Sequence, residues 1–292
     1  MRSVVITGTS SGIGLATAKL AVRNGARVFG SVRRAEDAAR LEAELGERFV
    51  PLLFDVRDEA AVSAEAERVR TMLAGETLSG LVNNAGTGIA GPVLHQPAEE
   101  IREQIETNLL SLFWVTRAFA PLLGADRALK GPPGRIVNMS SIGGKIGQPF
   151  GAAYVASKHG IEGFAEALRR EMALYDIKVV IMGPALVDTP IWDKLATAIG
   201  RYAQTDYAAA FDRGVGMMVD NGHRSGLPPE RVAEAVWHAL TTPHPRLRYS
   251  PARHPLIEQL GARGLPKRVL DWGMEQVLGL KPGRGDARSG RA

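Results

Sequence analysis

Cysteine is absent from the 292 residues of this sequence. Its absence excludes disulfide bonds, thiolate catalysis and cysteine-based metal sites. The six histidines show no metal-ligand spacing such as H-E-x-x-H, so we expect no bound metal. No apolar run is long enough to span a membrane, and the short apolar run after Met1 lacks the length and the cleavage site of a secretory signal. We therefore expect a cytoplasmic protein without a membrane span.

Acidic residues are only slightly fewer than basic ones, 31 against 36, which leaves a formal net charge of +5. The basic residues are scattered along the chain and are not interleaved with aromatic residues, so we expect no nucleic-acid partner. Part of the basic excess lies in residues 281–292, a segment of Gly, Pro, Ser and Arg. Because this segment cannot bury apolar surface, we predict a disordered tail there.

Short apolar runs alternate with longer amphipathic stretches, which is the pattern of a parallel sheet covered by helices. We expect strands at Ser3–Thr7, Arg27–Val32, Phe49–Asp55, Gly80–Asn83, Arg135–Ser140, Lys178–Met182 and Leu247–Ser250. We expect helices at Ile13–Asn24, Ala35–Leu45, Glu59–Ala74, Pro97–Leu123, Ala152–Tyr175 and Pro229–Thr241. The sequence therefore predicts one domain over residues 1–280, with a doubly wound α/β fold, a mostly parallel seven-stranded sheet and helices on both faces.

Residues 191–226 interrupt this alternation with several aromatic residues, two adjacent methionines and repeated glycines. We interpret the segment as a helical substrate flap near the carboxyl edge of the sheet, where ligands of open α/β sheets bind. Its apolar side chains that could line a substrate pocket are Ile191, Trp192, Leu195, Tyr202, Tyr207, Phe211, Met217 and Met218. The alternative for each of them is that it packs the flap onto the core.

A glycine-rich turn, Thr7–Gly14, lies between the first expected strand and the first expected helix. Its glycines let the backbone turn sharply and approach a pyrophosphate, and the following helix offers free N–H groups at the positive end of its dipole. Taken alone, such a turn is equally compatible with an ordinary loop. Its place between a strand and a helix favours a dinucleotide site in a Rossmann-type fold.

The end of the second expected strand indicates which dinucleotide is bound. A site for NAD expects an acid there, which accepts a hydrogen bond from the ribose 2′-hydroxyl. This strand ends in Arg33 and Arg34, and the nearest acids, Glu36 and Asp37, come later, in the next helix. Guanidinium groups suit a 2′-phosphate. We predict NADP(H) as the cofactor, with Arg33 as the main contact and Arg34 as its helper; the alternative is a solvated pair of surface arginines.

A serine pair and a tyrosine–lysine pair form the candidate chemical centre. Tyr154 and Lys158 are one turn apart on the same face of an expected helix, and Ser140 and Ser141 end the strand before it. We expect the ammonium of Lys158 to lower the pKa of Tyr154 from its ordinary value of about 10. The phenol would protonate a carbonyl, and its conjugate base would deprotonate an alcohol.

From about Val4 to Pro190 these motifs resemble the short-chain dehydrogenase/reductase family, in its compact single-domain branch. Segments after residue 86 and after residue 141 are similar to those of 17β-hydroxysteroid and retinol dehydrogenases. The family's Asn-Asn-Ala-Gly motif matches residues 83–86, and Ala185 stands where the family usually has a glycine. The full set of residues that we predict to bind the cofactor is Gly8, Ser10, Ser11, Gly12, Ile13, Gly14, Arg33, Arg34, Asp55, Val56, Asn83, Ala85, Gly86, Tyr154, Lys158, Pro184, Val187 and Thr189.

The resemblance also implies a catalytic set. The family's active serine lies thirteen residues before its tyrosine, which selects Ser141 over Ser140. Tyr154 and Lys158 match the catalytic pair, and Lys158 would also bind the nicotinamide ribose. Asn108 matches the helix asparagine that holds a proton-relay water in this family.

The function that follows is an NADP(H)-dependent oxidoreductase, which interconverts a primary or secondary alcohol and an aldehyde or ketone by hydride transfer. The flap favours a hydrophobic substrate of a steroid, retinoid or lipid kind. A non-catalytic dinucleotide-binding regulator with the same fold is the alternative, although such a regulator would tolerate loss of Ser141, Tyr154 or Lys158. By likeness to the family, we expect the helices at 97–123 and 152–175 to pair copies of the chain into a homodimer or homotetramer.

Overall fold

A computed structural model describes residues 1–253 and 266–281 of the chain. Seven parallel strands form one sheet in the order β3-β2-β1-β4-β5-β6-β7. The strands are β1 (Ser3–Ile6), β2 (Arg27–Val32), β3 (Phe49–Leu53), β4 (Gly80–Asn83), β5 (Arg135–Met139), β6 (Lys178–Met182) and β7 (Arg248–Tyr249). The order reverses between β1 and β4, so the predicted doubly wound, Rossmann-type fold is confirmed.

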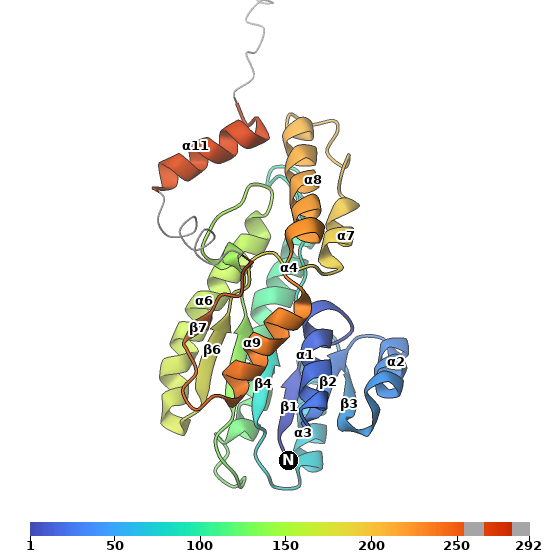
Figure 1. Cartoon of the computed structure of the whole chain (residues 1–292), viewed down its shortest axis with the longest axis vertical. Helices are drawn as coiled ribbons and strands as arrows, with labels where there is room; N and C mark the ends of the chain where they lie inside the picture. The colour runs from blue at the N-terminus through green and yellow to red at the C-terminus, as the bar shows by residue number, and fades with distance from the viewer. Residues whose placement is uncertain (254–265, 282–292) are drawn as a thin grey trace, which may run out of the picture.

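Helices cover both faces of the sheet and extend beyond its carboxyl edge (Figure 1). They are α1 (Gly12–Arg23), α2 (Ala35–Leu45), α3 (Glu59–Leu73), α4 (Ala98–Ile105), α5 (Ser111–Phe119), α6 (Ala152–Met172), α7 (Ile191–Ala196), α8 (Ala208–Ser225), α9 (Pro229–Thr241) and α11 (Lys267–Leu278). Short helical turns are η1 (Gly46–Arg48), η2 (Glu106–Leu110), η3 (Pro121–Leu123), η4 (Ile142–Gly144) and η5 (Ala173–Tyr175).

Successive side chains of each strand point to opposite faces of the sheet, so an apolar core forms on each face. In β1, Val5 points to the side of α3, α5 and α6, whereas Val4 and Ile6 point to the side of α1 and α9. All three side chains are at most 1% exposed. Strands with apolar residues in both directions need helices on both faces, which explains why the apolar runs in the sequence were continuous.

The single long helix expected at 97–123 is wrong: this stretch consists of α4, the π-helical turn η2, α5 and η3. The π-turn contains Asn108, whose side chain is fully buried and hydrogen-bonded to other segments. Further along, Pro121 lacks the N–H that would continue the α-helical ladder. The break therefore comes from tertiary contacts at Asn108 and from proline chemistry at the end.

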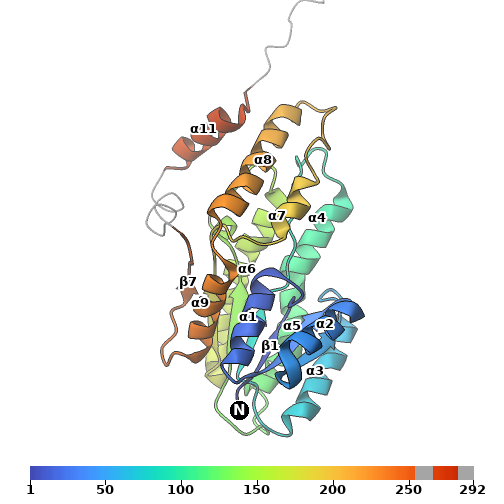
Figure 2. The same ribbon diagram turned by 45° about the vertical axis from the view of Figure 1, so that its right-hand side comes forward.

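The flap is helical, as expected, and consists of α7 and α8 with their connection. Figures 1 and 2 show both helices beyond the carboxyl edge of the sheet, with α11 beside α8. Phe211 is fully buried at the centre of an apolar cluster that joins the flap to Ala90 and Phe150. The sequence analysis did not predict α11, which packs Leu278 on Gly214 of α8.

The sequence also predicted a disordered tail and no membrane span, and the structure describes only part of the chain on which these two predictions depend. The tail expected at 281–292 lies outside the described residues except for Lys281. Within residues 1–253 and 266–281, no helix combines the length and the apolarity that crossing a membrane requires.

Candidate active site

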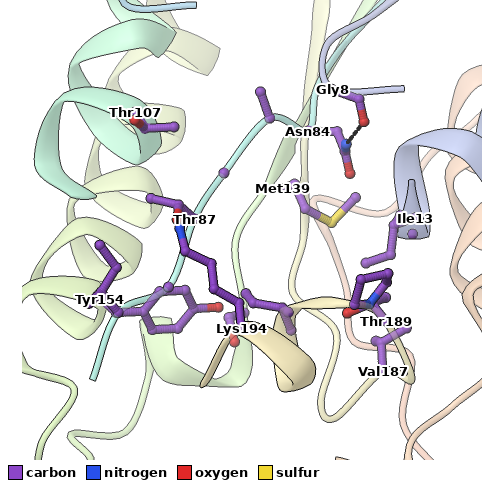
Figure 3. A pocket seen from close by; sticks show the side chains of 18 of the residues that line it. Gly8, Ile13, Asn84, Thr87, Thr107, Met139, Tyr154, Val187, Thr189 and Lys194 are labelled. Atoms are coloured by element: carbon purple, nitrogen blue, oxygen red, sulfur yellow. Dashed lines mark hydrogen bonds between the residues drawn. The ribbon is translucent and has the colours of Figure 1, made fainter. Parts of the chain in front are cut away.

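A cleft of about 460 Å³ lies at the carboxyl edge of the sheet, between the strand ends and the flap. The glycine-rich turn lies at one side of this cleft and Tyr154 at the other, with Lys194 of α7 between them (Figure 3). The volume is within the usual range for cofactor and ligand sites. The cleft lies beyond the ends of the paired strands β1 and β4, where the strand order reverses, which is the ligand position of doubly wound sheets.

The glycine-rich turn is held by close backbone contacts. Gly8 and Gly12 have φ of +71° and +56°, in the left-handed region that disfavours side chains. A Cβ on Gly14 would come within 2.1 Å of the Gly8 carbonyl oxygen. The Asn84 side chain donates to the carbonyls of Thr7 at 2.9 Å and Gly8 at 3.2 Å, and thus ties the turn to the end of β4 (Figure 3).

The N-terminus of α1 fits a dinucleotide pyrophosphate. Ser11 is the N-cap residue, yet within the described chain its side chain makes no capping hydrogen bond. The first N–H groups of α1 are therefore left for a ligand, at the positive end of the helix dipole. Ser10, Ser11, Gly12 and Ile13 line the cleft at this point.

Arginines surround the end of β2. Arg33 is exposed and lines the cleft. Arg34 turns away from it and pairs with Asp37 at 3.0 Å, and Arg40 donates to Asp37 at 2.9 Å and to the Ser10 carbonyl at 2.9 Å. The hydrogen bond from Arg40 is the main cause that lowers the pKa of Asp37, with Arg34 adding to it against burial. Asp37, the buried one of the two acids that follow this strand end, is thus paired with two guanidinium groups.

Asp55, after β3, lines the cleft beside Val56. Arg57 donates to both of its carboxylate oxygens, at 3.0 Å and 2.7 Å. The hydrogen bond from the Arg57 side chain is the main cause that lowers the pKa of Asp55. Asp55, one of the predicted cofactor residues, therefore lines the cleft with its charge already paired.

The chemical centre comes together from two elements. Ser141 precedes η4, and its Oγ accepts a hydrogen bond from the Gly143 N–H at 3.1 Å. Tyr154 and Lys158 lie in the first two turns of α6, and Lys158 Nζ donates to the Met139 carbonyl at 2.9 Å. All three line the cleft. A hydroxyl can accept and donate hydrogen bonds at the same time. The Ser141 oxygen accepts from the backbone, and its hydroxyl hydrogen can donate toward the cleft or toward Tyr154.

The pKa shifts at this centre correct one expectation. Burial raises the pKa of Tyr154, and the hydrogen bond with Ser141 only partly opposes this. Burial also lowers the pKa of Lys158 from 10.5 to about 8. We expected the ammonium to lower the pKa of Tyr154, and this direction is wrong, because loss of hydration disfavours the phenolate more than its neighbours stabilise it.

Asn108 lies behind the cleft, in the π-turn. Its Oδ1 accepts from the Thr87 N–H at 2.7 Å, and its Nδ2 donates to the Thr87 carbonyl at 2.9 Å and to Ser157 Oγ at 3.1 Å. The side chain therefore joins the segment after β4 to α6, one residue before Lys158. π-turns often mark functional positions.

Most of the predicted cofactor residues line this one cleft. Those that do are Gly8, Ser10, Ser11, Gly12, Ile13, Arg33, Asp55, Val56, Ala85, Gly86, Tyr154, Lys158, Pro184, Val187 and Thr189. The other three, Gly14, Arg34 and Asn83, lie outside its lining as the described residues define it, and so does Asn108, which was predicted as a catalytic residue. Gly14 packs against the turn, and Asn83 donates to Asn138 on the neighbouring strand at 2.8 Å.

Thr87, after β4, and Lys194, on α7, are among the cleft residues that were not predicted from the sequence. Lys194 of α7 extends across the cleft, where its Nζ donates to Thr87 Oγ1 at 3.0 Å (Figure 3). Neither residue belongs to a motif, and their meeting depends on how the flap folds back over the sheet. A local sequence pattern carries no signal for such a contact.

The part of the cleft beside α7 and α8 is largely apolar. Of the flap residues considered, Ile191, Trp192, Leu195 and Met218 line it, together with Ile89, Pro149 and Phe150 from the sheet side. Tyr202, Tyr207 and Phe211 belong to or pack on the flap cluster, as the alternative interpretation expected, and Met217 is 42% exposed.

Several known proteins are similar to this chain over most of its length. A family model described as short chain dehydrogenase matches residues 2–200. An NADPH-dependent 3-dehydrocapnine reductase from Ornithobacterium rhinotracheale is 37% identical, over 93% of this chain and 95% of the relative. Retinol dehydrogenase 5 from Mus musculus is 32% identical, over 94% of this chain and 88% of the relative.

Solved structures of similar proteins share the whole architecture. A short-chain dehydrogenase from Streptomyces avermitilis superposes with a TM-score of 0.76 at 26% identity, covering 96% of this chain and 98% of that one. An actinorhodin polyketide ketoreductase with NADPH gives a TM-score of 0.72 at 30% identity, covering 87% of this chain and 96% of that one.

Proposed function

The chain belongs to the short-chain dehydrogenase family, and on this premise we propose that it is an NADP(H)-dependent oxidoreductase that interconverts a hydrophobic ketone or aldehyde and the corresponding alcohol. One observation carries the proposal: Ser141, Tyr154 and Lys158 meet in one cleft that also contains the glycine-rich turn. A regulator that only bound the dinucleotide would not need these three side chains together.

Tyr154 is the proposed general acid in carbonyl reduction. Burial raises the pKa of Tyr154, so the phenol keeps its proton at neutral pH, the state that a proton donor requires. The Ser141 hydroxyl is the second donor to the substrate oxygen, where it stabilises the negative charge that builds up. In alcohol oxidation the same two groups act in reverse, and Tyr154 accepts the proton.

Lys158 is proposed to hold positive charge beside the reacting oxygen and to bind the nicotinamide ribose. Its Nζ already donates to the Met139 carbonyl, which fixes the direction of the side chain. Because burial lowers its pKa to about 8, Lys158 is mainly protonated at neutral pH. The Asn108 side chain supports this position through Ser157, the residue next to Lys158.

A nicotinamide dinucleotide, when bound, supplies or accepts the hydride. The residues proposed to hold it are those of the glycine-rich turn, Asp55 and Val56, the segment after β4, and Pro184, Val187 and Thr189. Arg33 supports a 2′-phosphate, because it is a cleft arginine at the end of β2. Of the two acids that follow, neither Glu36 nor Asp37 is in the cleft lining, and Asp37 is paired with Arg34 and Arg40. One relative, named as an NADPH-dependent reductase, points the same way.

The substrate class follows from the apolar end of the cleft. Ile191, Trp192, Leu195 and Met218 would contact a hydrophobic substrate next to Tyr154. Relatives named as retinol dehydrogenases and as a 3-dehydrocapnine reductase support a steroid-, retinoid- or lipid-like carbonyl compound. We also propose that copies of the chain form a homodimer or homotetramer through α5 and α6.

The experiment that tests the function measures the loss of NADPH absorbance with a panel of ketones and aldehydes of increasing chain length and ring number. We expect turnover of apolar carbonyl compounds, with NADPH preferred to NADH. Activity restricted to small polar sugars would refute the substrate class, and absence of binding to either dinucleotide would refute the function as a whole.

A further inference from the structure

A buried ion cluster lies next to the Ser141 backbone. It consists of Glu162 on α6, Arg248 on β7 and Lys145 after η4, none of which is among the residues lining the cleft. Glu162 is only 5% exposed, and the Arg248 side chain is 17% exposed. Burying such charges costs free energy unless each is paired and hydrogen-bonded.

Glu162 makes a full set of contacts. Its Oε1 accepts from Ser140 Oγ at 2.7 Å and from Arg248 Nη2 at 3.2 Å, and its Oε2 lies 2.9 Å from Lys145 Nζ. Burial raises the pKa of Glu162, but the hydrogen bonds from Lys145, Ser140 and Arg248 outweigh it and hold the pKa below its ordinary value. Glu162 is therefore a carboxylate that binds the residue before Ser141.

Arg248 binds Ser141 itself. Its Nη2 donates to the Ser141 carbonyl oxygen at 3.3 Å. The guanidinium lies over Gly183 of the segment after β6, where a Cβ would come within 2.1 Å of Nη2. Glycine at 183 thus leaves the space that the guanidinium occupies between Glu162 and Ser141.

The rest of the Ser141 segment is anchored on both sides. The Ser140 N–H donates to the Met182 carbonyl at 2.7 Å, and the Ile142 N–H donates to the Pro184 carbonyl at 2.8 Å. Together with the contacts from Glu162 and Arg248, these bonds fix the backbone that determines where the Ser141 hydroxyl points. A carboxylate and a guanidinium from elements 86 residues apart thus converge on this backbone.

We propose that Glu162 and Arg248 are positioning residues, which hold the Ser140–Ser141 backbone so that the Ser141 hydroxyl faces the substrate oxygen beside Tyr154. The inference rests on the proposed function, because it concerns the same chemical centre. A hydroxyl displaced by about 1 Å loses much of its effect on the transition state, so the expected loss in kcat is roughly 10- to 100-fold.

The test compares Glu162→Gln, Arg248→Lys and Ser140→Ala with the parent enzyme, each with and without Ser141→Ala. Arg248→Lys keeps the charge but loses the fork that reaches both Glu162 and Ser141. Ser140→Ala removes the hydrogen bond to Glu162 at 2.7 Å together with a longer one to the Lys158 carbonyl at 3.4 Å. Glu234→Gln is the matched control, because Glu234 forms an exposed pair with Arg231 on α9. The readouts are kcat and KM for the carbonyl substrate, the Kd for NADPH and the Tm.

We expect kcat to fall in the three single variants while the Kd for NADPH stays within about twofold, and we expect Glu234→Gln to match the parent. In the Ser141→Ala background the same substitutions should have little further effect, because residues that act through one group are non-additive. Equal losses in both backgrounds, or full activity of all three single variants, would overturn the inference while the proposed function stands. An inactive parent enzyme that does not bind NADPH would overturn both. If Glu162→Gln does not fold, the kcat of Ser140→Ala, the smallest of the three changes, measured with and without Ser141→Ala, tests the inference in its place.

Discussion

The Lys158 ammonium lies 5.6 Å from the centre of the Tyr154 ring, and it donates a hydrogen bond to the Met139 carbonyl at 2.9 Å. Burial acts on both groups in opposite directions, since it raises the pKa of Tyr154 and lowers the pKa of Lys158 to about 8. Near neutral pH the pair therefore consists of a neutral phenol and a mainly charged amine. This is the protonation state that reduction of a carbonyl needs, whereas oxidation of an alcohol needs the phenolate.

Tyr154→Phe should abolish proton transfer and leave the binding of the cofactor nearly intact. General acid catalysis contributes about 10²- to 10⁴-fold, so kcat should fall by that factor while the Kd for NADPH changes little. Steady-state kinetics and fluorescence titration with NADPH measure the two quantities. Unchanged turnover in this variant would exclude Tyr154 as the acid.

Lys158 should make the stability of the cofactor-free protein depend on pH. Its pKa is about 8 in the folded protein and 10.5 ordinarily, so the unfolded chain binds more protons between these values. The free energy of unfolding should therefore rise with pH from about 8 to 10.5, by about 2–3 kcal/mol for this group. Urea denaturation of the parent and of Lys158→Met at pH 7 and pH 10 measures the difference, which should shrink or vanish in the variant. If the free energy of unfolding changes between pH 7 and pH 10 by the same amount in the parent and in Lys158→Met, the lowered pKa of Lys158 is not the cause of the pH dependence.

Arg33→Ala should weaken NADPH binding and leave NADH binding unchanged. A hydrogen bond to a charged group contributes about 1.5–3 kcal/mol, which corresponds to a roughly 10- to 100-fold rise in the Kd for NADPH. Arg34→Ala is the informative comparison, because the Arg34 guanidinium pairs with Asp37 outside the cleft lining, and its effect should be smaller. Equal losses for NADH and NADPH in Arg33→Ala would mean that the arginine does not recognise a 2′-phosphate.

Local patterns predicted the sheet and much of the cleft. Apolar runs such as Val4–Ile6 and the glycine-rich turn are contiguous in sequence, and their structure follows from strand geometry and from the close approach at Gly8 and Gly14. Tyr154 and Lys158 share a helix face, so their proximity could also be predicted from the sequence.

What could not be predicted depends on residues far apart in sequence. The π-turn forms where Asn108 meets Thr87 and Ser157, so periodicity within 97–123 could not reveal it. The direction of the Tyr154 shift depends on burial that the folded chain provides, and the meeting of Glu162 with Arg248 needs β7 to be placed beside β6.

Gly14→Ala should damage the glycine-rich turn, although Gly14 lies outside the cleft lining. The new Cβ would come within 2.1 Å of the Gly8 carbonyl oxygen and 2.5 Å of Asn84 Nδ2, so the turn or the Asn84 side chain must move. Overpacking of this kind costs about 1–3 kcal/mol, and NADPH binding should weaken with it. Gly163→Ala on α6 is the control. Apart from its chain neighbours and the nearby backbone of α6 itself, no heavy atom of the described chain lies within 4 Å of its Cβ position, and the substitution should stabilise the helix by up to about 1 kcal/mol. Thermal unfolding and NADPH titration distinguish the two.

Phe113→Glu should convert the proposed oligomer into monomers. Phe113 on α5 is 51% exposed, and its ring lies 4.6 Å from that of Phe164 on α6, so the two helices present a joint aromatic surface. Leu110, the last residue of the π-turn, is 39% exposed and lies one helical turn before Phe113. Large apolar groups gathered on a surface mark a protein contact, and a buried, unpaired glutamate there costs several kcal/mol.

Leu94→Glu is the control, because Leu94 is 76% exposed in the connection before α4, and the new charge there should leave the mass of the oligomer unchanged. Sedimentation velocity gives the mass of each variant. A parent chain that sediments as a monomer would exclude the pairing, and a Phe113→Glu variant with the mass of an intact oligomer would place the interface on another face.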